Sequence, residues 1–210
     1  MLLKSIVEQL NTLNASLNKN INMDSKKFNG GFSVDQNNVD DFSEQEASSC
    51  ELIDNREPLK KRTARALLFH VLYAADIFDF EIPVEEIVVG FNAEYETGIE
   101  SDNYIIPTVK AIGEKREELD AYFRPFLKNW KYERIGYCTI LILRYAIWEI
   151  LYSDTHHNII INEAIELAKC FAEKDAFKFV NGILDKISKQ YLEEHPEKTI
   201  QELILINENE

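Results

Sequence analysis

The stretch INEAIELAKCFAEKDAFKFVNGILD, at residues 161–185, decides the fold class of this chain. Apolar residues recur at helical spacing on both sides of a polar break, so the stretch predicts two helices in succession. A rotation of about 100° per residue defines the two faces of the second helix. The predicted core face consists of Phe177, Val180, Ile183, Leu184, Ile187 and Tyr191. The predicted outer side consists of Asp175, Lys178, Phe179, Gly182 and Lys186.

Gly182 is an unusual residue for the interior of this second helix, because glycine there costs about 1 kcal/mol relative to alanine. Two explanations remain open. Another helix of the same domain packs against Gly182, or the missing side chain lets a binding partner approach the helix backbone closely. Under the second explanation Gly182 is a partner-binding residue.

Helical patterns continue back from this stretch as far as Pro58, and glycine is scarce, with 7 in 210 residues. No alternation of polar and apolar residues indicates a hairpin. The sequence therefore predicts an all-α domain at residues 58–192, between a partly disordered N-terminal extension at 1–57 and an acidic tail at 193–210. The predicted helices cover residues 59–78, 83–93, 102–123, 125–131, 136–152, 158–171 and 175–192.

The first predicted helix combines a core face with basic and aromatic residues on its other side. The predicted core residues are Ala64, Leu67, Leu68, Val71, Leu72, Ala75 and Phe78. The flank and far side hold Arg62, Arg65, Phe69, Tyr73 and Asp76, just after Lys60 and Lys61. Cations contact a phosphate backbone and aromatic rings stack on unpaired bases, so this side is a candidate RNA surface. The alternative is a solvated face whose two aromatic residues are covered by other helices.

The formal net charge of −14 argues at first against nucleic-acid binding, but the charge is unevenly distributed. Residues 35–57 hold eight acids and one base, and residues 193–210 hold six acids and one base. The predicted domain at 58–192 carries 17 bases and 21 acids, so it can present a local basic patch. Two roles remain open for residues 35–57: a solubilising tail, or a segment that competes with RNA for the basic helix.

Catalytic and metal-binding motifs are not found in the sequence. There is no glycine-rich phosphate loop, G-x-S-x-G or H-E-x-x-H pattern, and we expect neither an enzyme nor a cofactor. The adjacent His156 and His157 fall in a predicted loop and are expected to be exposed to solvent. Three widely spaced cysteines argue against a disulfide framework, and no signal peptide or membrane span is evident. These features favour a cytoplasmic protein.

Three motifs resemble the NusB family of transcription antitermination factors. They are KKRTARALLFHVLYAADI at residues 60–77, LRYAIWEIL at 143–151, and the closing pair INEAIELAK and KFVNGILDK. The resemblance implies a compact all-helical domain of two small helical bundles. It also implies a non-catalytic adaptor that binds boxA-type RNA together with NusE, a small-subunit ribosomal protein. Such an adaptor helps the RNA polymerase elongation complex to read through terminators, notably in ribosomal RNA operons.

The resemblance also implies roles for individual residues. The RNA-binding set comprises Lys61, Arg62 and Arg65 on phosphates, Phe179 against the RNA, and Asp175 and Lys178 along the same edge. The partner-binding set comprises Tyr73 on the NusE surface, with Phe69 and Gly182. Thr139 and Ile140 stand where many members have a charged pair, which departs from the pattern on the NusE side. A protein-binding helical adaptor without RNA affinity is the alternative, and both monomers and homodimers occur in the family.

Overall fold

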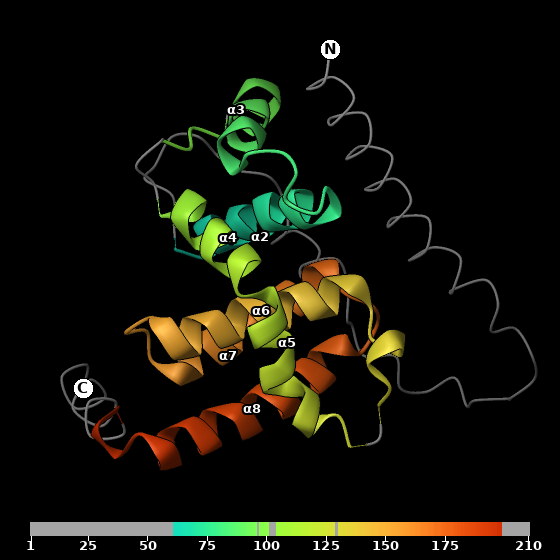
Figure 1. Cartoon of the computed structure of the whole chain (residues 1–210), viewed down its shortest axis with the longest axis vertical. Coiled ribbons are helices and arrows are strands. Elements are labelled where there is room, and N and C mark those ends of the chain that lie inside the picture. The colour runs from blue at the N-terminus through green and yellow to red at the C-terminus, as the bar shows by residue number, and fades with distance from the viewer. Residues whose placement is uncertain (1–60, 96, 101–103, 129, 199–210) are drawn as a thin grey trace, which may run out of the picture.

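The computed structural model describes residues 61–95, 97–100, 104–128 and 130–198, with side chains from Ala64 onward. These ranges form seven α-helices and two short 3-10 helices and contain no strand (Figure 1). The elements are α2 (Lys61–Ile77), α3 (Val84–Tyr95), α4 (Ile105–Glu114), α5 (Arg116–Phe123), η2 (Arg124–Phe126), η3 (Tyr132–Arg134), α6 (Tyr137–Tyr152), α7 (His157–Phe171) and α8 (Ala176–Glu194). The all-α prediction is confirmed. The whole predicted N-terminal extension at 1–57, and residues 199–210 of the predicted tail, lie outside the described residues.

The helices form two bundles that meet along α2 (Figure 1). Helices α2, α3 and α4 pack against one another, and α5 to α8 assemble around α6. Helix α2 also contacts α6 and α7, so it is covered from both bundles. One continuous hydrophobic core runs through both bundles, and its fully buried members include Leu68 and Leu72 on α2 and Leu141 and Ile147 on α6.

The core faces of the first and last helices are largely as predicted. On α2 the residues from Ala64 to Ala75 that were assigned to the core are all buried, and Phe78 is half-buried. On α8 the residues from Val180 to Tyr191 assigned to the core are buried. Phe177 is only half-buried, because it lies in the first turn of α8, where the side chains of Lys169 and Lys178 lie over its ring.

The middle of the chain departs from the predicted helices. The helix predicted at 102–123 is interrupted at Lys115, whose φ of −101° and ψ of 9° separate α4 from α5. Just before this break, the ring of Phe80 occupies the place that a β-carbon on Gly113 would take. The helix predicted at 125–131 is wrong, because the described residues there form only η2 and a turn.

The structure also corrects the predictions for the histidines and describes two of the cysteines. His157 is buried and its Nδ1 lies 2.8 Å from the hydroxyl of Ser188, whereas His156 caps α7 by accepting a hydrogen bond from the backbone N–H of Asn158. Cys138 is buried and free, whereas Cys170 is disulfide-bonded. Among the described residues, no helix is both long enough and apolar enough to cross a membrane.

Candidate nucleic-acid interface

The start of α8 brings three of the predicted RNA-binding residues together on one surface. Asp175 adopts a left-handed backbone conformation, with φ of 67°, and its carbonyl accepts a hydrogen bond from the N–H of Lys178. The two exposed side chains form an ion pair of 2.7 Å, and the hydrogen bond from Lys178 lowers the pKa of the Asp175 carboxyl. Phe179 lies next to them, half-buried at the edge of the bundle. Their placement off the core face agrees with the helical rotation.

Gly182 follows Phe179 by one turn on the same side of α8. A β-carbon at Gly182 would meet no described atom within 4 Å. The first explanation for this glycine, that another helix of the domain packs against it, is therefore wrong for the described residues. The second explanation, close approach of a partner to the helix backbone, stays a prediction.

Arg65 on α2 was predicted to contact RNA from an exposed flank, and that exposure is wrong. Its side chain is buried, and its guanidinium donates two hydrogen bonds, of 3.2 and 3.4 Å, to the carboxylate of Glu149 on α6. Burial by itself lowers the pKa of Arg65, but the charge and hydrogen bonds of Glu149 outweigh burial and raise it. The physical reason is that α6 covers this flank of α2, so the cation is paired inside the protein.

Phe69 was predicted to be an exposed partner contact, and this is also wrong, because the residue is only 2% exposed. Its ring stacks on Phe171 of α7, with the centroids 4.9 Å apart. The alternative reading, that other helices cover the aromatic residues, is correct for Phe69, whereas Tyr73 is only half-buried. The side chains of Lys61 and Arg62 lie outside the described part of the structure, so their RNA contacts stay predictions.

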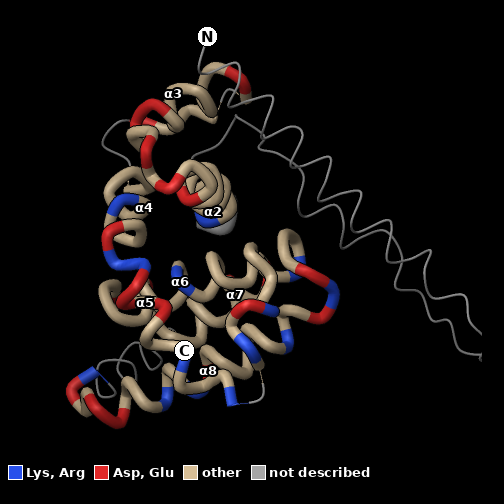
Figure 2. Tube along the Cα trace, turned by 45° about the vertical axis from the view of Figure 1, so that its right-hand side comes forward, with Lys and Arg blue, Asp and Glu red and all other residues tan. Residues whose placement is uncertain are grey.

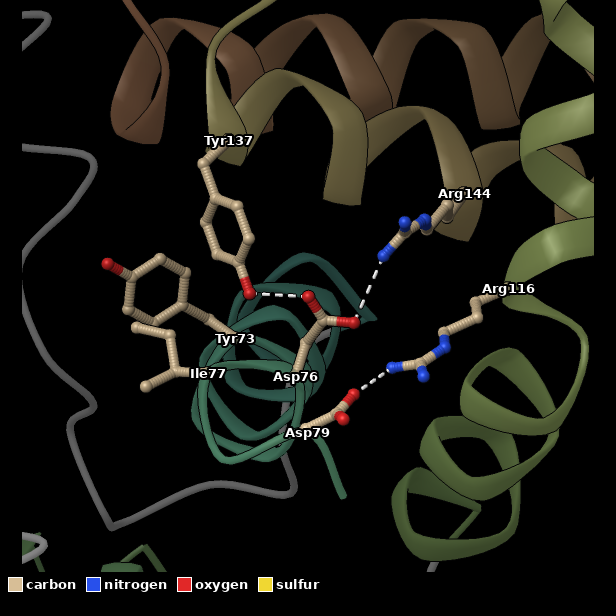
Figure 3. Close-up of a pocket in the computed structure, with 7 residues that line it drawn as sticks. All are labelled: Tyr73, Asp76, Ile77, Asp79, Arg116, Tyr137 and Arg144. Atoms are coloured by element: carbon tan, nitrogen blue, oxygen red, sulfur yellow. Dashed lines mark hydrogen bonds and ion pairs between the residues drawn. The ribbon is translucent and has the colours of Figure 1, made fainter. Parts of the chain in front are cut away.

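A second surface feature lies where the end of α2 faces α5 and α6. Tyr73 lines a pocket of about 640 Å³ there (Figure 3). The pocket is lined by Tyr73, Asp76, Ile77, Asp79, Arg116, Tyr137 and Arg144. The ring of Tyr73 meets that of Tyr137 edge-on, with centroids 5.6 Å apart. The pocket thus lies between the two bundles, and its lining includes two tyrosine rings.

The charges of this pocket are paired within the protein. The Arg144 guanidinium donates to Asp76 at 3.0 Å (Figure 3). It also donates to Asp120 at 2.7 and 2.8 Å. Burial lowers the pKa of Arg144, but the hydrogen bonds and charge of Asp120 and the charge of Asp76 outweigh it and hold the guanidinium positive. The Tyr137 hydroxyl donates a hydrogen bond to Asp76. Burial raises the pKa of Tyr137 most, and this hydrogen bond raises it further. Arg116 pairs with Asp79. This network ties α2 to α5 and α6.

Sequence reasoning missed Trp130, which is 55% exposed and lies beside Phe179, with the ring centroids 5.0 Å apart. It also missed the ionic network around Arg144. Each had a signal in the sequence. Basic and aromatic residues alternate through RPFLKNWKYER at 124–134, and Arg144 interrupts the most apolar stretch of the chain, which indicates a buried partner.

The lysines and arginines of the described residues are concentrated in the second bundle, which comprises α5 to α8 (Figure 2). Residues 61–114 carry four bases and ten acids, whereas residues 115–198 carry 13 bases and 14 acids. No group of three or more His, Cys, Asp or Glu within the described ranges is placed to hold a metal ion. The geometry therefore offers surfaces for binding: a half-buried aromatic and lysine face on α8, and a tyrosine-lined pocket at the end of α2.

The comparison with known proteins supports the family resemblance of the sequence motifs. A model described as the NusB family matches residues 62–189. The transcription antitermination protein NusB of Bacillus mycoides is 36% identical over 133 residues, which is 61% of this chain and 97% of that protein. Its namesake in Staphylococcus epidermidis is 32% identical over 130 residues, covering 62% of this chain and 99% of that protein. By the extent of these matches, which run through the helices of both bundles, the chain belongs to the NusB family.

Proposed function

We propose that this chain is a non-catalytic adaptor that binds boxA-type RNA together with the ribosomal protein NusE. In this role it promotes readthrough of terminators by the RNA polymerase elongation complex, notably in ribosomal RNA operons. The observation that carries the proposal is the outer face at the start of α8, where Asp175, Lys178 and Phe179 lie together. Such an adaptor acts in the cytoplasm, where transcription and its ribosomal partner are found.

The RNA surface of the proposal runs from the start of α2 to the outer face of α8. Lys61 and Arg62 supply charge to RNA phosphates, while Phe179 offers a ring face to unpaired bases. Gly182 leaves the backbone of α8 open beside that ring. Arg65 does not contact the RNA directly, because it is buried in an ion pair with Glu149. It supports the RNA surface by fixing α2 on α6.

The NusE surface of the proposal centres on the pocket at Tyr73. Its tyrosine pair is accessible, with Tyr137 41% exposed, and amphipathic tyrosine rings are well suited to protein interfaces. The aspartates and arginines behind the pair are already neutralised by one another. We therefore expect binding at this surface to rest on aromatic packing more than on charge.

Anisotropy of a labelled boxA RNA, titrated with the full chain in the presence and absence of NusE, tests the proposal. A scrambled RNA of equal length serves as the control. We expect selective binding that tightens with NusE, weakens with added salt, and weakens in the Phe179→Ala variant. Helical circular dichroism of the variant checks that it is folded.

One observation favours a second candidate function, a protein-binding helical adaptor of the same fold without RNA affinity. Arg65, one of three predicted phosphate contacts on α2, is neutralised by Glu149. Binding of neither boxA nor scrambled RNA, together with retained binding of NusE, would establish this second function and reject the first. Equal binding of the two RNAs would reject the boxA selectivity of the first function without establishing the second.

A further inference from the structure

Trp130 is the most exposed large aromatic residue of the described structure. More than half of its surface is accessible, and its ring lies 5.0 Å from Phe179 with the two planes inclined by 55°. The two rings come from distant parts of the sequence, the segment before η3 and the first turn of α8. They form an aromatic step on the surface, and one of its two rings is left largely uncovered.

The face of α8 beside this step is open. Phe179, Gly182 and Lys186 follow one another at spacings of three and four residues, so they line one stripe of the helix. The position of a β-carbon on Gly182 is empty, and Lys186 is exposed. A flat group that stacks on the aromatic step therefore has room to lie along the helix backbone toward the exposed amine of Lys186.

The charges around Trp130 differ from those of the pocket at Tyr73. Residues 124–134 contain four bases and one acid. Lys128 and Lys131 are exposed on either side of Trp130, and neither they nor Lys186 form an ion pair with any described residue. In the pocket, by contrast, both arginines are paired with carboxylates. Cations that pair with no described residue, beside a largely exposed indole, complement a ligand that is both anionic and aromatic.

The segment that carries Trp130 is held in place by contacts on both sides of this residue. The Tyr132 hydroxyl donates to Asp120 at 2.6 Å, and its ring stacks on buried Phe123 with centroids 5.9 Å apart. The guanidinium of Arg124 also lies over the Tyr132 ring, 4.5 Å from its centroid. Trp130 itself donates its backbone N–H to the carbonyl of Leu127 at 3.1 Å. The indole is thus presented from an anchored backbone, which lowers the entropic cost of stacking.

The α8 side of the step is fixed to the same region. Glu173, in the loop between α7 and α8, accepts a hydrogen bond of 3.0 Å from the hydroxyl of Thr139. Its carboxylate also fills the place of a β-carbon on Gly136, just before α6 begins. The loop that leads into α8 is therefore tied to the start of α6.

We propose that Trp130 is a base-stacking residue for single-stranded RNA, acting with Phe179, while Lys131 and Lys186 contact the adjoining phosphates. A run of unpaired nucleotides satisfies the rings and the cations together, because each nucleotide has one flat base and one negative phosphate. This inference rests on the proposed RNA-binding function and adds Trp130 to its surface. It also predicts that bases near the step are bound by stacking, with little readout of their identity.

The test uses the full chain with Trp148→Phe, which leaves Trp130 as the only tryptophan. Stacked bases quench indole fluorescence, so titration with boxA RNA should quench Trp130 in step with the anisotropy of a labelled RNA. Trp130→Ala should weaken RNA binding by roughly 5- to 100-fold, and Trp130→Phe by less, since a ring remains to stack. Tyr152→Ala is the matched control. Tyr152 is also an exposed aromatic residue, but it lies at the C-terminal end of α6, whereas Trp130 lies before the N-terminal end of that helix.

The outcomes separate this inference from the proposed function. If RNA binding is selective and sensitive to Phe179→Ala, but Trp130→Ala binds like the unaltered chain, the stacking role of Trp130 is rejected and the function stands. If Trp130→Ala loses affinity for NusE and keeps affinity for RNA, the step is a protein surface and the inference is likewise rejected. If the unaltered chain binds no RNA, both fail.

Discussion

Helices α2 and α8 carry similar side chains on their flanks, yet the fold uses them in opposite ways. On α2, Arg65 and Phe69 are buried against α6 and α7. On α8, Lys178 is exposed and Phe179 is half-buried at the surface. The difference follows from position, since α2 lies between two bundles and α8 packs mainly against α6 and α7 of one bundle (Figure 1).

The comparison shows what helical rotation can and cannot predict. Rotation gives the direction of each side chain around the helix axis, but it does not give the width of the covered arc. For α8 the covered arc is one apolar face, so the residues predicted to lie outside it do so. For α2 the covered arc extends across both flanks. Arg65 and Phe69, which the rotation placed outside the core face, are therefore buried and help to hold the fold together. Substitutions on the flanks of the two helices should therefore have different effects on stability.

The largest expected effect is on α2, where Phe69→Ala should lower the free energy of unfolding by about 4 kcal/mol, because it leaves a cavity against Phe171. The same change on α8, Phe179→Ala, should cost about 1 kcal/mol, since that ring is only partly covered. Urea denaturation of the two variants measures both values. Equal losses in the two variants would contradict the distinction between the helices.

The charged residues should show the same contrast with a smaller effect. Arg65→Ala leaves Glu149 buried without its partner and should cost about 3 kcal/mol of stability. Lys178→Ala on α8 should leave stability unchanged within error, because its ion pair is exposed to solvent. In the same denaturation assay, the double change Arg65→Met with Glu149→Leu should recover most of the loss. An Arg65→Ala protein as stable as the unaltered chain would show that the ion pair contributes nothing.

The same limit of local reasoning explains which parts of the fold were predictable. The helices at both ends of the domain have long, regular apolar patterns, and their core faces were predicted almost residue by residue. The break between α4 and α5 comes two residues after Gly113, where the ring of Phe80 packs, and periodicity does not encode a contact between such distant parts of the chain. Gly113 near a helix end was the available signal.

The candidate site divides along the same line. Asp175, Lys178 and Phe179 could be placed from the sequence because a single helix carries them. The pairing of Trp130 with Phe179 could not, since it depends on how the segment before α6 folds against α8. The pairing of Arg144 with two aspartates likewise joins three helices. The residue types of Trp130 and Arg144 indicated that each has a role, but only the fold shows which residues they contact.

His70 offers a third comparison, because it lies on the covered side of α2, where its ring meets Phe171 edge-on at 4.9 Å. Burial lowers the pKa of His70 from 6.5 to about 4. Between these values the unfolded chain binds a proton that the folded chain does not, so stability falls as pH falls. The loss from this residue should reach about 2 kcal/mol between pH 7.5 and pH 5.

The His70→Leu variant isolates this contribution from that of the carboxylates. Urea denaturation at pH 7.5 and pH 5 should show a smaller loss of stability for the variant than for the unaltered chain. The difference between the two losses is the contribution of His70. Parallel losses in both proteins would mean that His70 is accessible to water, and that the covered arc of α2 is narrower than the structure shows.

The smallest expected effect concerns Gly182, and it separates stability from binding. Alanine at Gly182 should raise the free energy of unfolding by about 0.5–1 kcal/mol, because helix propensity improves and the new methyl meets no described atom. RNA affinity should fall at the same time, since that methyl occupies the open backbone beside Phe179. Gln190→Ala, at an exposed position two turns further along α8, is the control and should leave affinity unchanged. A Gly182→Ala protein that is more stable and binds RNA equally well would show that no partner approaches α8 here. The open side of α8 would then be solvent-facing like any other exposed helix, and the contrast with α2 would be one of burial alone.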